Sequence, residues 1–99
     1  MSLKYNFNIR EDDLWLEPLI LKEGVVIEIK CKGIDMTRGH RVMFVVNNKV
    51  IEETSTGSED FIKNFGENIN ETKKEEFNRL QRWANFLIEK HSIDIKNNS

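Results

Sequence analysis

The stretch VVIEIKCKGIDMTRGHRVMFVVNNKVIEET, residues 25–54, decides the fold of this 99-residue chain. At its start, apolar residues occupy every second position: Val25, Ile27, Ile29 and Cys31. Alternation with a period of two is typical of a strand that buries one face and exposes the other. We therefore predict a strand over 25–32, with the thiol of Cys31 on the buried face.

Two further strands follow within the same stretch. Residues 42–46 are apolar without interruption, which predicts a strand over 41–47 in the middle of a sheet with both faces covered. Asn47 and Asn48 come next, and asparagine tolerates the positive φ that a two-residue hairpin turn requires. The chain should then return as an antiparallel strand over 49–54.

Two weaker strand signals precede this stretch. The first is an alternation of apolar with polar residues, at Tyr5, Phe7 and Ile9. It predicts a strand over 4–10. Residues 14–21 are apolar enough for another strand, although Pro18 lacks an N–H group and restricts it to a sheet edge, a bulge or a break.

Beyond residue 55 the sequence changes to helix patterns. Ser58 can cap a helix over 58–65, and Gly66 is suited to end it. A longer helix is predicted over 72–91, with a capping box at Thr72–Glu75 and Asn70 as a rival cap. Apolar residues recur at helical spacing along it: Phe77, Leu80, Trp83, Ala84, Leu87, Ile88 and His91.

Strands first and helices second favour an α+β fold. We predict an antiparallel meander of about five strands, with two C-terminal helices packed on one face of the sheet. Residues 1–91 should form a single domain, and the polar residues 92–99 a frayed tail.

Composition excludes several classes of protein and site. The net charge is −2, and although residues 22–50 hold six basic and three acidic side chains, this excess is small for a nucleic-acid binder. A lone cysteine rules out an internal disulfide and any multi-cysteine zinc site. The N-terminus lacks the apolar core of a signal peptide, and no apolar run reaches membrane-spanning length, so we expect a cytoplasmic protein.

The reactive side chains do not converge in the predicted fold. Cys31 could act as a nucleophile with His40 as its base, but a thiol among aliphatic side chains is inert. His91 is expected at the end of the long helix, where its imidazolium suits the helix dipole better than it suits a metal. No phosphate-binding loop or hydrolase motif is present, and we predict no catalytic residue, no metal and no cofactor.

Surface residues around a predicted loop are better candidates for binding. Gly33 and Gly39 should allow a hairpin loop of roughly six to eight residues between two strands. Trp15 is expected in the core, or else exposed as an anchor for a partner. The candidate partner-binding residues are therefore Trp15, Lys32, Asp35, Arg38, His40 and Arg41.

A small non-enzymatic protein-binding module fits these features best. It could be an inhibitor, an immunity-type protein or an accessory protein of a phage or mobile element, and the acidic flanks favour a partner with a basic surface. One alternative is a nucleic-acid-associated protein that uses the basic segment 30–49. Another is a small hydrolase or nuclease-like enzyme that uses His40 and Arg41. A homodimer is compatible with all three.

Overall fold

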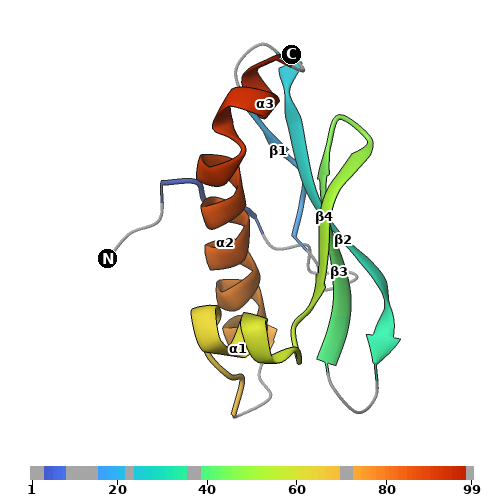
Figure 1. The fold of residues 1–99 in the computed structure, drawn as a ribbon, viewed down its shortest axis with the longest axis vertical. Coiled ribbons are helices and arrows are strands. Elements are labelled where there is room, and N and C mark those ends of the chain that lie inside the picture. The colour runs from blue at the N-terminus through green and yellow to red at the C-terminus, as the bar shows by residue number, and fades with distance from the viewer. Residues whose placement is uncertain (1–3, 9–15, 22–23, 36–38, 70–72, 98–99) are drawn as a thin grey trace.

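The fold is α+β, as predicted, with an antiparallel four-stranded sheet followed by helices (Figure 1). The computed structural model describes residues 4–8, 16–21, 24–35, 39–69 and 73–97. The strands lie in the order β1-β2-β3-β4. The elements are β1 (Leu19–Ile20), β2 (Val26–Asp35), β3 (Gly39–Val46), β4 (Lys49–Ser55), α1 (Glu59–Phe65), α2 (Lys73–Lys90) and α3 (Ser92–Asn97).

The β3–β4 hairpin has the predicted turn. Asn47 and Asn48 have φ values of 48° and 69°, so both occupy the left-handed region that a two-residue hairpin needs. Asn47 also ties the turn to β2, because its Oδ1 accepts a hydrogen bond of 2.9 Å from the backbone N–H of Val26. The uninterrupted apolar run accordingly lies in β3, inside the sheet.

The long β2–β3 loop predicted from the two glycines is wrong. β2 continues to Asp35 and β3 begins at Gly39, so the ladder passes both glycines. The register shifts between Cys31 and Gly33, and Gly33 then pairs with Arg41. A β-bulge absorbs one extra residue while the strands stay paired, which the sequence pattern alone does not reveal.

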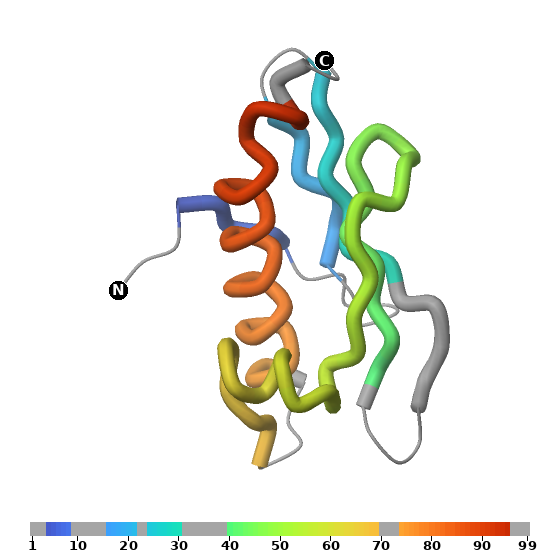
Figure 2. The backbone as a smooth tube through the Cα atoms, in the orientation of Figure 1, coloured from blue at the N-terminus to red at the C-terminus, as the bar shows by residue number. Residues whose placement is uncertain are grey.

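The two N-terminal strand predictions are also corrected, and the sheet has four strands rather than about five. Only Leu19–Ile20 of the predicted strand 14–21 forms β1, directly after Pro18, which cannot donate to a ladder. Residues 4–8 form no strand and lie beside α2 instead (Figure 2). There the backbone N–H of Tyr5 donates to Asn85 Oδ1 at 2.8 Å. Residues 9–10 and 14–15 of the two predicted strands lie outside the described part, and the other described residues of 14–21 belong to no strand of the sheet.

The helices begin and end close to the predicted positions. Ser58 caps α1 by accepting a 3.3 Å hydrogen bond from the N–H of Phe61, and Gly66 ends the helix with φ 88°. The predicted caps of the longer helix, Asn70 and Thr72, lie outside the described residues. The frayed tail is a wrong prediction, because Ser92–Asn97 forms α3 and buries Ile95 to 7% exposure.

One hydrophobic core joins side chains from the sheet and from all three helices. The rings of Phe44 in β3 and Trp83 in α2 meet edge to face, with centroids 6.3 Å apart. Val25, Ile27 and Ile29 are buried as the alternation predicted, while the side chain of Cys31 lies outside the described part. The core residues that define the helical side are Phe61, Phe77, Leu80, Trp83, Ala84, Leu87, Ile88 and Ile95.

Candidate functional site

The predicted partner-binding residues are only partly described. Trp15 and Arg38 lie outside the described residues, and Lys32 and Asp35 are placed by their backbone alone, in β2. His40 and Arg41 are neighbours in β3 and therefore point to opposite faces of the sheet. The structure thus separates the two residues that the nuclease-like hypothesis requires to act together.

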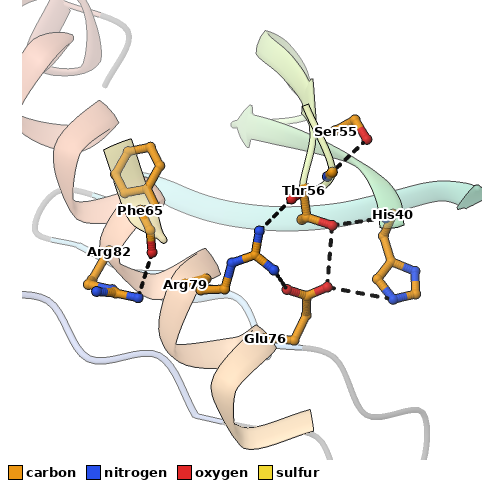
Figure 3. Close-up of polar contacts among 8 residues, drawn as sticks. His40, Ser55, Thr56, Phe65, Glu76, Arg79 and Arg82 are labelled. Carbon is orange, nitrogen blue, oxygen red and sulfur yellow. Dashed lines mark hydrogen bonds and ion pairs between the residues drawn. The ribbon is translucent and has the colours of Figure 1, made fainter. Parts of the chain in front are cut away.

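His40 belongs to a polar network that joins β3 and the end of β4 to α2 (Figure 3). Its backbone N–H donates to Thr56 Oγ1 at 2.9 Å, and its carbonyl accepts from the N–H of Thr56 at 2.9 Å. The Thr56 hydroxyl donates in turn to Glu76 Oε2 at 3.3 Å. His40 Nε2 lies 3.8 Å from the same carboxylate oxygen. The carboxylate of Glu76 on α2 is therefore contacted by side chains from outside its own helix.

Arg79 is the buried cation of this network, with 5% of its surface exposed. Its Nη1 donates to Glu76 Oε1 at 2.7 Å, and its Nη2 donates to the carbonyl oxygen of Thr56. The guanidinium also lies over the ring of Phe61, 4.9 Å from its centroid. Since these contacts hold α1 and α2 to the residue that follows β4, the network's evident role is structural.

A second arginine on α2 fixes the end of α1. Arg82 Nη2 donates to the carbonyl oxygen of Phe65 at 2.7 Å, which satisfies a backbone group at the C-terminal end of α1. The Phe65 ring meets the ring of Phe86 at a centroid distance of 6.0 Å and an angle of 66°. Phe86 is 55% exposed. We call Phe65, Arg82 and Phe86 the aromatic surface.

Successive ring contacts connect the aromatic surface to the core. The centroid of Phe65 lies 5.0 Å from that of Phe61, and Phe61 lies 6.2 Å from Trp83. Trp83 then contacts Phe44 of the sheet. An aromatic side chain supported in this way has few alternative positions, so the aromatic surface is pre-organised.

Sequence reasoning missed Phe86, although a signal was present. The predicted apolar stripe of the helix passes through Ala84 and Leu87, and Phe86 lies about 100° around the helix from Leu87. An aromatic residue outside the buried stripe of an amphipathic helix must either meet another element or remain exposed. Phe86 does both, because it contacts Phe65 and keeps half of its surface in water.

The other histidine forms a separate link at the far end of α2. His91 Nε2 lies 2.5 Å from Glu52 Oε2, and Lys90 Nζ lies 3.3 Å from the same oxygen. Burial opposes ionisation of Glu52, but the hydrogen bonds from His91 and Lys90 outweigh it and lower the pKa of this carboxyl. Glu52 pairs with Phe44 in the ladder and Glu53 with Met43, so the two carboxylates point to opposite faces.

The described residues contain no cluster of three or more histidine, cysteine, aspartate or glutamate side chains that could hold a metal ion. None of the helices in the described ranges has the length and apolar content needed to cross a bilayer. The chain matches no protein-family model, no curated protein and no solved structure.

Proposed function

We propose that the chain is a non-enzymatic protein-binding module that contacts its partner through the aromatic surface. The exposed ring of Phe86 carries the proposal. Phenylalanine buries a large apolar area when it enters a partner's pocket, and an arginine beside it is typical of the residues that dominate binding energy. Phe86 and Arg82 lie one helical turn apart on α2, which makes them neighbours on one face.

Pre-organisation supports the proposal further. Ordering a side chain on binding costs about 0.5–1.5 kcal/mol, which reduces the affinity by the same amount. The Phe65 contact limits the positions of Phe86, and the bond to the Phe65 carbonyl limits those of Arg82. Less freedom is lost on docking here than on a surface of unsupported side chains.

The proposal takes α1 and α2 to cover one face of the sheet, which directs the aromatic surface away from it (Figure 1). The ring contacts support this arrangement, because Trp83 lies between Phe44 of the sheet and Phe61 of α1. His40 and Arg41 remain predicted contact residues, one on each face of β3, and 63% of the Arg41 side chain is exposed. A non-enzymatic role agrees with the structural use of Glu76 and Arg79 within the network.

Capture from a native lysate tests the proposal. The wild-type chain and a Phe86→Ser variant are immobilised, with Ile20→Ser as a matched control because Ile20 is an exposed apolar residue on β1. The wild type should retain a protein in stoichiometric amount, and Phe86→Ser should retain at least about tenfold less, since truncating a dominant contact costs about 2 kcal/mol or more. Absence of a stoichiometric partner, or equal retention by all three chains, would refute the proposal.

A further inference from the structure

The charges beside Phe86 define the partner more closely. The side chains next to Phe86 on α2 are those three and four positions away along the helix: Arg82, Trp83, Glu89 and Lys90. Trp83 is buried, and Glu89 forms an ion pair with Lys4 at 3.2 Å. Arg82 and Lys90 therefore set the charge around the ring, one turn before it and one turn after it.

Both cations remain accessible. Arg82 is exposed and uses Nη2 for the Phe65 carbonyl, one of the five N–H donors of a guanidinium. Lys90 contacts Glu52 at 3.3 Å, yet 51% of its side chain is exposed. The Glu52 carboxylate is hydrogen-bonded to both His91 and Lys90, and its side chain is 32% exposed, so Lys90 is the more accessible member of this pair.

A second copy of the chain does not fit this pattern. If two copies of α2 packed antiparallel about a two-fold axis at Phe86, Arg82 of each copy would face Lys90 of the other. Parallel packing would place Arg82 of one copy against Arg82 of the other copy. Like charges opposed across an interface disfavour association, so the surface discriminates against self-pairing.

We infer that the segment docking on the aromatic surface is an acidic peptide of another protein, with an apolar side chain between two carboxylates. This inference rests on the proposed function. The apolar side chain packs on Phe86 and Phe65, and the carboxylates meet Arg82 and Lys90. Eight residues of helix separate these cations, so the two carboxylates should lie about 12 Å apart. The acidic flanks of the sequence predict a partner with a basic surface, whereas the charges beside Phe86 predict an acidic one.

An unbiased selection tests the inference. A displayed library of random peptides about 16 residues long is panned on the wild-type chain and depleted on Phe86→Ser. The surviving peptides should be enriched in aspartate and glutamate on both sides of an aromatic or aliphatic residue. Panning on the charge-reversed variant Arg82→Glu/Lys90→Glu should enrich lysine and arginine in the same places instead.

Affinity measurement on one enriched peptide completes the test. Replacement of Lys90 by Gln should weaken binding about 1.4-fold to fivefold, since an exposed ion pair contributes about 0.2–1 kcal/mol. A rise in salt concentration should remove the same difference. Neutral or basic peptides from the wild-type panning, or unchanged preferences after charge reversal, would overturn the acidic character of the partner. They would leave the proposed protein-binding function standing. A selection that yields no peptide dependent on Phe86 would overturn it too, while the lysate capture reports separately on protein binding.

Discussion

Replacement of Arg79 by Met removes the buried cation of the network and should destabilise the chain strongly. Arg79 is 5% exposed, and the side chain of its partner Glu76 is 13% exposed. Methionine is long enough to fill the space beside Phe61, but it leaves the Glu76 carboxylate in the interior without the Arg79 cation. Removing one partner of a buried ion pair costs about 3–5 kcal/mol, against a total stability of about 5–15 kcal/mol.

Thermal and urea unfolding followed by circular dichroism would measure this loss. The unfolding midpoint should fall by at least about 12 °C, since each kcal/mol shifts it by about 4–8 °C in a domain of this size. The matched control is Arg82→Met on the same helix, which removes an exposed hydrogen bond and should cost less than about 1.5 kcal/mol.

A double variant separates the charge effect from packing. Glu76→Leu combined with Arg79→Met removes both charges, and it should be about 1–3 kcal/mol more stable than the sum of the single losses predicts. Arg79 Nε supports this expectation, because it is buried without a hydrogen-bond partner among the described residues. A loss below about 1 kcal/mol for Arg79→Met would contradict the reasoning, because an exposed ion pair would behave in that way.

Two further outcomes are expected. Because the pKa of Glu52 is lowered in the folded chain, this carboxylate contributes stability above its unfolded pKa of about 4.3, and the contribution disappears as pH falls through the lower folded value. Glu52→Gln should therefore reduce the pH dependence of the free energy of unfolding in urea below about pH 4. If this pH dependence is unchanged, the contacts of Glu52 with His91 and Lys90 do not cause it. At Asn48, with φ 69°, valine should cost about 1–2 kcal/mol and glycine should not, whereas equal losses would argue against the observed turn.

Local patterns predicted the elements that need only local information. Alternation at Val25, Ile27 and Ile29 placed β2, the pair of asparagines placed the hairpin, and Ser58 with Gly66 bounded α1. In each case the deciding chemistry lies within a few neighbouring residues.

Elements that depend on distant contacts were not predictable. Residues 4–8 have the alternation of a strand, but the side chains of Gln81 and Asn85 satisfy their backbone groups in place of a sheet neighbour. The tail became a helix because Ile95 reaches the core. The β-bulge beside Gly33 and the meeting of Phe86 with Phe65 likewise require knowledge of the partner element.

The line of rings that runs inward from Phe86 also gives the molecule an optical reporter. Trp83 is 4% exposed, so its indole emits from a dry environment, and the ring contacts through Phe61 and Phe65 connect it to the exposed ring. Trp15 is the only other tryptophan, and its replacement by phenylalanine would assign the whole emission to Trp83. A ligand that displaces Phe86 even slightly should then change the quantum yield of a chromophore that it never touches.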